Sequence, residues 1–153
     1  MGRLVACGVL AGLGACSPGV DTAVVIRVID GDTVELEGGE RVRYLMVNTP
    51  ETTGGKNECY GSNAVTFNTD LVLGKEVELR YDVQEQDNFG RTLAYVSVEG
   101  MEVNRLIVDR GFGCVLHIAP NGTDRLDEFV SLEQAARLAK RGLWGTCDPI
   151  PCD

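Results

Sequence analysis

The chain has 153 residues and a mass of 16.5 kDa, which corresponds to a single domain. Its composition is 44% hydrophobic and 24% charged, which is typical of a globular protein and excludes a disordered or collagen-like chain. With 14 basic and 23 acidic residues the net charge is −9, so the protein has no general electrostatic attraction to nucleic acid or anionic lipid. A polyanion would therefore need a local basic site or a bound cation.

The N-terminus has the layout of a secretory signal. Arg3 precedes an apolar stretch that is shorter than the roughly 20 residues needed to cross a bilayer as a helix. The stretch ends in Leu13-Gly14-Ala15-Cys16, which resembles a bacterial lipoprotein signal. This resemblance predicts a signal peptide over residues 1–15, a lipid anchor on Cys16 and a tether over residues 16–22. The protein is then expected outside the cytoplasm, anchored to the bacterial envelope through Cys16 or secreted. An ordinary secretory signal and a buried hydrophobic helix are the alternatives.

Short segments that alternate apolar and polar residues, or gather β-branched ones, predict five strands. They are expected at residues 23–29, 33–37, 41–47, 75–81 and 91–98. Gly38-Gly39 predicts a hairpin turn between the second and third strands, because glycine adopts positive φ without steric cost. Asn48-Thr49-Pro50 is expected to end the third strand.

Apolar residues at helical spacing predict three helices. The first ends at Gly74, the second ends at Gly111, and the third runs from about Asp124 to Arg141, with Trp144 beyond it as a cap on the core. Their expected inner faces are Ala64, Phe67 and Leu71; Val103, Leu106 and Ile107; and Leu132, Ala135, Ala136, Ala139 and Leu143. Five short strands with separate helices predict an α+β fold, namely a five-stranded OB-fold-like β-barrel with three α-helices.

Four cysteines follow Cys16, and an even number outside the cytoplasm indicates disulfides. Their spacing does not match a zinc site, which would have close Cys/His pairs. Four cysteines allow three connectivities, and the sequence leaves the pairing open. The four are Cys59, Cys114, Cys147 and Cys152, the last of them in a short tail over residues 148–153.

Four motifs carry polar groups suited to chemistry: Asp30-Gly31-Asp32-Thr33, Arg43, Asn48-Thr49-Pro50-Glu51 and Asp87-Asn88-Phe89-Gly90-Arg91. Each alone has a structural interpretation as a tight turn, a solvated strand charge or a helix start. Together, in this order and at the ends of the predicted elements, they resemble the staphylococcal nuclease family. The resemblance extends from about residue 23 to residue 144, within an expected domain over residues 23–147.

The resemblance implies an OB-type barrel with three helices and Ca²⁺-dependent hydrolysis of phosphodiester bonds in DNA or RNA, with little sequence preference. Arg43 and Arg91 match the arginines that bind the phosphate, and a guanidinium can do so bidentately. Glu51 matches the carboxylate assigned as general base for the attacking water. Asp32, Asn48 and the backbone carbonyl of Thr49 match the metal ligands, and all three offer the hard oxygens that Ca²⁺ prefers. A monomer is expected.

Departures from the family pattern keep other functions open. Asn48 stands where the family has an aspartate, so Ca²⁺ affinity is expected to be lower. Residues 116–120 lack the tyrosines on which the family's type enzyme stacks its substrate. The alternative is a non-catalytic, nucleic-acid- or protein-binding OB-fold lipoprotein. A third hypothesis is a structural envelope lipoprotein in which Asp30-Gly31-Asp32 is only a turn.

Overall fold

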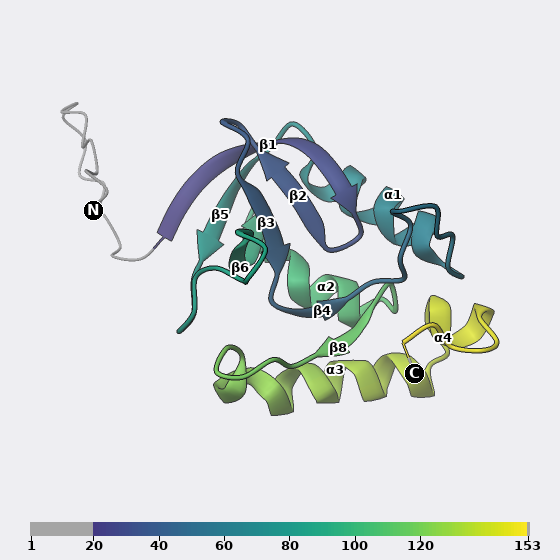
Figure 1. Ribbon diagram of the computed structural model, residues 1–153. Coiled ribbons are helices and arrows are strands. Elements are labelled where there is room, and N and C mark those ends of the chain that lie inside the picture. The colour runs from purple at the N-terminus through teal and green to yellow at the C-terminus, as the bar shows by residue number, and fades with distance from the viewer. Residues whose placement is uncertain (1–19, 153) are drawn as a thin grey trace, which may run out of the picture.

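The computed structural model describes residues 20–152, so the predicted signal peptide and Cys16 lie outside the described residues. Within that range five strands close into a barrel (Figure 1). They are β1 (Val20–Asp30), β2 (Thr33–Leu36), β3 (Arg41–Tyr44), β5 (Glu76–Arg80) and β6 (Thr92–Val98). A parallel pairing of β3 with β6 closes the barrel, and every other pairing within it is antiparallel. The predicted α+β, OB-fold-like architecture is therefore confirmed.

β1 serves both halves of the barrel because it is long and curved (Figure 1). Its first part, Val20 to Val24, pairs with β5, and its second part, Val25 to Asp30, pairs with β2. The strand begins three residues before the predicted start at residue 23. The predicted start of this strand is therefore wrong, and residues 20–22 pair with β5 in the barrel.

The prediction of one strand over residues 41–47 is also wrong. The segment is divided into β3 and β4 (Met46–Asn48), and Met46 between them has a left-handed φ of 64°. Barrel pairing ends at Leu45, whose N–H donates to the Ala94 carbonyl at 3.0 Å. β4 then leaves the barrel and pairs with β8 (Cys114–Leu116). This bend turns the end of β4 toward the loop that joins β1 to β2.

Three main helices accompany the barrel, as predicted: α1 (Gly61–Val72), α2 (Val103–Asp109) and α3 (Leu126–Leu138). Smaller elements are β7 (Met101–Glu102), a 3₁₀ turn at Thr123–Arg125, and α4 (Leu143–Thr146). Figure 1 shows α3 lying along β8, below the barrel, with α4 at its far end.

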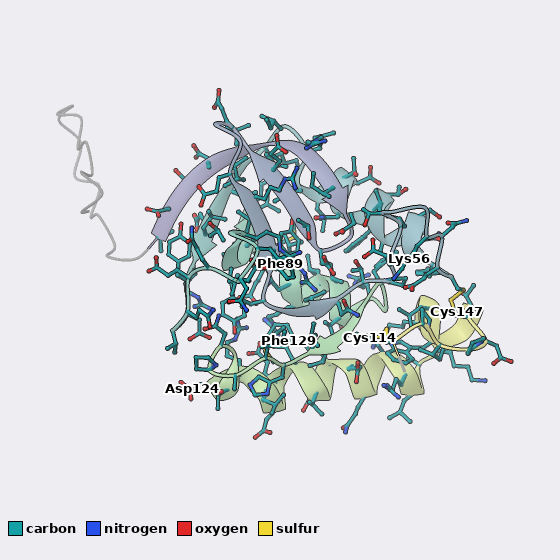
Figure 2. All side chains as sticks on the ribbon, viewed as in Figure 1. Lys56, Phe89, Cys114, Asp124, Phe129 and Cys147 are labelled. Atoms are coloured by element: carbon teal, nitrogen blue, oxygen red, sulfur yellow. A yellow bond between two sulfur atoms is a disulfide. The ribbon has the colours of Figure 1, made fainter. Side chains whose placement is uncertain are left out.

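The last helix is shorter than the predicted Asp124–Arg141. It ends at Leu138, because Lys140 and Gly142 have positive φ and turn the chain into α4. Leu143 of the predicted apolar face therefore lies in α4, and Ala135 and Ala139 are exposed. Phe129 and Ala136 are the buried residues of α3, and Phe129 points toward the core (Figure 2).

A second, smaller apolar cluster lies beside the main core and contains both disulfides. It is built from Cys114, Leu143 and Cys147, with Trp144 half-buried against it. Of the three possible connectivities, the structure has Cys59–Cys147 and Cys114–Cys152. Both bonds tie the C-terminal segment to the rest of the domain. In residues 20–152 no helix combines the length and the apolar character that crossing a bilayer requires.

Candidate active site

The turn between β1 and β2 carries Asp32 and belongs to the candidate site. Gly31 has no space for a side chain, because a Cβ there would lie 2.7 Å from the Ala64 Cβ and from the Thr49 Oγ1. Asn68 of α1 donates a hydrogen bond to the Asp30 carbonyl at 3.2 Å. The turn is thus packed between α1 and the end of β4, which is a tighter environment than a solvated hairpin has.

Asp32 is the best-connected carboxylate of the site and is only 5% exposed. Its Oδ2 accepts hydrogen bonds from the Thr49 N–H at 2.9 Å and from the Thr49 hydroxyl at 3.2 Å. Its Oδ1 accepts from the Thr33 hydroxyl at 3.0 Å. The Arg43 Nη2 lies 3.2 Å from Oδ2. A buried carboxylate needs such partners, because burial without them is costly.

Both Nη nitrogens of the Arg43 guanidinium have partners, and the side chain is 13% exposed. Its Nη1 donates to the carbonyl of Tyr44 at 2.6 Å and to that of Val47 at 2.7 Å. Its Nη2 approaches the Asn48 Oδ1 at 3.5 Å, in addition to Asp32. The bend at Met46 makes this possible, because it brings the carbonyls on both sides of it onto one arginine. The structure therefore brings the predicted residues Asp32, Arg43, Asn48 and Thr49 into one connected group.

The oxygens of this group suit a hard divalent cation. Asp32 supplies a carboxylate, Asn48 a side-chain carbonyl and Thr49 a backbone carbonyl, and all three are oxygen donors of the kind that Ca²⁺ takes. Within residues 20–152 no three His, Cys, Asp or Glu side chains gather as a metal cluster. Of the three donors, only Asp32 is a carboxylate. Asp30 belongs to the predicted Asp30-Gly31-Asp32-Thr33 motif but was given no role of its own; its Oδ1 accepts the Asp32 N–H at 3.0 Å. Burial, and next the charge of Asp32, raise the pKa of Asp30 to about 7.

Arg91 lies immediately before β6, next to β3 in the barrel. Its Nε donates to the Asp87 Oδ2 at 2.7 Å, an i,i+4 pair that the sequence spacing already contained. Burial alone would raise the pKa of Asp87, but hydrogen bonds from Arg91 and from the Phe89 N–H lower it below its usual value. The turn over residues 87–91 is therefore held in place by the pairing of Asp87 with Arg91.

Arg43 and Arg91 line the same cavity, which has a volume of about 430 Å³. Phe89, 85% exposed, stands at its rim in front of the barrel (Figure 2). Leu116 and Ile118 also line it. His117 does not line the cavity; its Nε2 lies 3.3 Å from the Thr123 hydroxyl. The cavity thus combines two cations with an apolar rim.

Glu51 occupies the loop that follows β4 and does not line this cavity. Its Oε1 accepts hydrogen bonds from the Thr53 N–H at 2.7 Å and from the Thr53 hydroxyl. These bonds lower the pKa of Glu51 below its ordinary value, against a smaller opposing effect of burial. The carboxylate is therefore ionised at neutral pH. Of the predicted catalytic residues, the structure brings Arg43 and Arg91 to one cavity and leaves Glu51 on the neighbouring loop.

Comparison with known proteins identifies the family. The model of the family described as staphylococcal nuclease homologues matches residues 41–146. Endonuclease YncB of Bacillus subtilis is 37% identical over 125 residues, which are 77% of this chain and 59% of that protein. The SPbeta prophage-derived endonuclease YokF of the same organism is 34% identical over 125 residues, 77% of this chain and 42% of that protein.

Thermonuclease of Staphylococcus hyicus is 34% identical over 128 residues, which are 80% of this chain and 75% of that protein. The chain thus spans about half the length of YncB and YokF, and three quarters of the thermonuclease. The matched region contains β3, the site residues of β4 and its following loop, and Arg91. On the barrel, the site and these matches together, the chain belongs to the family of staphylococcal nuclease homologues.

Proposed function

We propose that this chain is a Ca²⁺-dependent nuclease that hydrolyses phosphodiester bonds of DNA or RNA with little sequence preference. The observation that carries the proposal is the cavity shared by Arg43 and Arg91, next to the oxygen donors of Asp32, Asn48 and Thr49. Two guanidinium groups at one cavity in a protein of net charge −9 form the local basic site that an acidic protein needs to bind a polyanion.

The arginines have different donors left for a phosphate. Both hydrogens of the Arg43 Nη1 are taken by backbone carbonyls, and its Nη2 faces Asp32 and Asn48, which leaves Nε to face a substrate. Arg91 uses Nε for Asp87, which leaves its two Nη groups. Fixed donors of this kind stabilise the charge that builds on the phosphorus oxygens during attack, and they need little reorganisation at that moment.

Glu51 is the group proposed to accept the proton of the attacking water. The water oxygen bonds to phosphorus, its proton passes to Glu51, the bond from phosphorus to the leaving oxygen breaks, and the leaving oxygen takes up a proton from solvent water. The hydrogen bonds from Thr53 support this role because they keep the carboxylate ionised.

Asp32, Asn48 and Thr49 are the residues proposed to hold Ca²⁺. When bound, the ion would supply positive charge to the phosphate oxygens. The carboxamide of Asn48 contributes an oxygen without a charge, so we expect a site of modest affinity that fills where calcium is plentiful.

The test is a cleavage assay on single-stranded and double-stranded DNA and on RNA, with Ca²⁺ and with a chelator. Cleavage should require Ca²⁺, and Glu51→Gln and Arg91→Ala should each lose at least about a hundredfold in rate. Arg110→Ala, which replaces an exposed arginine at the C-terminal end of α2, is the matched control and should retain the parent rate. Undiminished cleavage by the Glu51 and Arg91 variants would show that the site lies elsewhere.

A second candidate function is a non-catalytic binding module on the same barrel. It is favoured by Asn48 in place of a charged ligand and by Leu116 and Ile118 at the cavity rim. It predicts nucleic-acid or protein binding without cleavage under any divalent ion. The same assay, run beside a binding measurement, distinguishes the two functions.

The location outside the cytoplasm is also a proposal. It is supported by the two disulfides, which persist in oxidising compartments. A lipid anchor on Cys16 would be separated from β1 by residues 17–19 only, so the barrel would lie close to the membrane. Mass spectrometry of the purified protein should find acyl chains on Cys16, and Cys16→Ala should release the protein from membranes as a monomer on size-exclusion chromatography.

A further inference from the structure

The loop that carries Glu51 has little structure of its own. It runs from the end of β4 to the start of α1, and its central residues 53–57 are exposed. Gly54 and Gly55 at its tip have positive φ values of 62° and 81°. Neither a strand nor a helix therefore fixes the position of Glu51, although a proton acceptor has to be held close to the attacked phosphorus.

Glu58 closes this loop on Glu51 through two hydrogen bonds. The Glu51 N–H donates to the Glu58 Oε2 at 2.7 Å, and the Glu58 N–H donates to the Glu51 carbonyl at 3.0 Å. The two residues thus form a clasp at the base of the loop, and the side chain of Glu58 holds the backbone from which the Glu51 carboxylate extends.

The next residue after this clasp is covalently attached to the other end of the chain. Cys59 is bonded to Cys147, 88 residues later. Figure 2 shows Cys147 beneath the loop that bears Lys56, at the end of α4.

Cys147 itself lies on a firmly docked segment. It is buried against Leu143, whose N–H donates to the Gly111 carbonyl at 2.9 Å. The Arg141 Nη1 donates to the Asp109 carbonyl at 2.6 Å. The C-terminal segment is thus held on the end of α2. The Cys59–Cys147 disulfide attaches the end of the Glu51 loop to this segment.

We propose that Glu58 and the Cys59–Cys147 disulfide are positioning elements that hold the Glu51 loop in place for hydrolysis. The inference rests on the proposed function of Glu51. It assigns the C-terminal segment a part in the reaction although none of its residues lines the cavity of Arg43 and Arg91. An oxidised cross-link would then be a condition for full activity, besides its effect on stability.

The first test compares two pairs of substitutions in the full chain, with cleavage measured in Ca²⁺. Cys59→Ala/Cys147→Ala should lower kcat about tenfold, because small displacements of a reacting group are costly in rate. KM should stay within about twofold, because the phosphate-binding arginines lie outside the loop. Cys114→Ala/Cys152→Ala also removes one cross-link but leaves the loop attached, so its kcat should stay within about twofold of the parent.

Glu58 supplies a test that leaves both disulfides intact. Glu58→Ala removes the acceptor for the Glu51 N–H and should lower kcat as the Cys59/Cys147 pair does. Glu58→Gln keeps an oxygen at that position and should restore most of the rate. Thermal unfolding curves establish that each variant is folded at the assay temperature, and Glu58→Ala keeps the proposal testable if the Cys59/Cys147 pair fails to fold.

A double-mutant comparison distinguishes the positioning role of the disulfide from the proposed role of Glu51 as proton acceptor. Glu51→Gln is made in the parent and in the Cys59→Ala/Cys147→Ala background, and a positioning role predicts a smaller loss in the second. Equal losses in both backgrounds would overturn the positioning role and leave the function of Glu51 intact. No loss in the parent would overturn the assignment of Glu51 itself. A tenfold fall in kcat for Cys114→Ala/Cys152→Ala would overturn the positioning role, because a loss of stability alone would then explain the effect of both pairs.

Discussion

Replacing Arg43 with alanine should destabilise the fold itself, apart from any effect on cleavage. The guanidinium connects the β1–β2 turn, through Asp32, to both sides of the bend between β3 and β4, through the carbonyls of Tyr44 and Val47. Truncation would leave these carbonyls without their donor in a buried region and would remove the cation beside a buried carboxylate.

The size of the effect follows from those contacts. A buried acceptor that loses its partner costs about 1–3 kcal/mol, and removing one member of a buried ion pair costs about 3–5 kcal/mol. The terms share one guanidinium and do not add in full, and the Thr49 and Thr33 donors still stabilise Asp32. We therefore expect Arg43→Ala to lower the free energy of unfolding by about 3–5 kcal/mol, which for a chain of this size lowers Tm by about 6–20 °C.

Urea unfolding followed by fluorescence measures this directly, because Trp144 is the single tryptophan of the chain. Arg41→Ala is the matched control two residues earlier on β3. Its side chain is 58% exposed and pairs with Glu35 at 3.8 Å, so the control should cost less than about 1 kcal/mol. Both proteins are compared with their disulfides oxidised.

Equal losses for Arg43→Ala and Arg41→Ala would refute the reasoning. That result would mean that the turn and the bend hold their positions without the guanidinium. Arg43 would then be free to act on the phosphate alone, and loss of cleavage in an Arg43 variant could be assigned wholly to substrate binding.

Three further measurements test other parts of the structure. Asn48→Asp should lower the Ca²⁺ concentration for half-maximal cleavage by about tenfold, because it adds a charged ligand; an unchanged calcium titration would remove Asn48 from the metal site. Hydrogen bonds from Arg125 lower the pKa of Glu128, so their stabilisation is present above the usual carboxyl pKa and is lost as the pH falls through the lowered value. The free energy of unfolding should thus fall more steeply below about pH 4 in the parent than in Glu128→Gln, and parallel curves would contradict this. Phe129→Ala removes a ring that is 0% exposed and should cost about 3–5 kcal/mol in urea unfolding, whereas Leu138→Ala, at 87% exposure, should cost less than about 0.5 kcal/mol.

The barrel was predictable because its strands have a strong local pattern. In β5, Val77 and Leu79 are buried, whereas Glu76, Glu78 and Arg80 are exposed, so the alternation in the sequence reports the two faces directly. α1 likewise buries Ala64 and Val72 on one side. Where one face of an element meets the core and the other meets water, the spacing of apolar residues along the sequence predicts the type of element.

The bend at Met46 was not predictable, because it has no such local pattern. Residues 41–47 read as one apolar strand, and nothing local marks a break. The interactions that fix it come from far along the chain. Asn104 of α2 donates to the Leu45 carbonyl at 2.9 Å, and Leu45 itself bonds to Ala94 of β6. The early end of α3 has a similar origin, because the Arg141 and Gly142 backbones pack closely against Gly111.

The predicted residues of the candidate site fall into two groups by what positions them. Asp32, Arg43 and Thr49 are in direct contact because the barrel closes and the chain bends, so their motifs, once placed at element ends, carried enough information. The surroundings of Glu51 were missed, because a clasp to Glu58 has no periodic signal. A disulfide between residues 88 apart is one of three possible pairings.

These two groups respond differently to perturbation. The arginines proposed to bind the phosphate lie on β3 and directly before β6, strands that pair on both sides, so their geometry persists until the barrel itself unfolds. Glu51 is held by side-chain hydrogen bonds and a cross-link to the C-terminal segment, which can be lost while the barrel stays closed. If these groups have the proposed roles, substrate binding and turnover are separable. A reductant at a concentration that leaves the barrel folded should reduce kcat while the protein still binds nucleic acid, because reduction releases the loop that carries the carboxylate and leaves the two guanidinium groups in place.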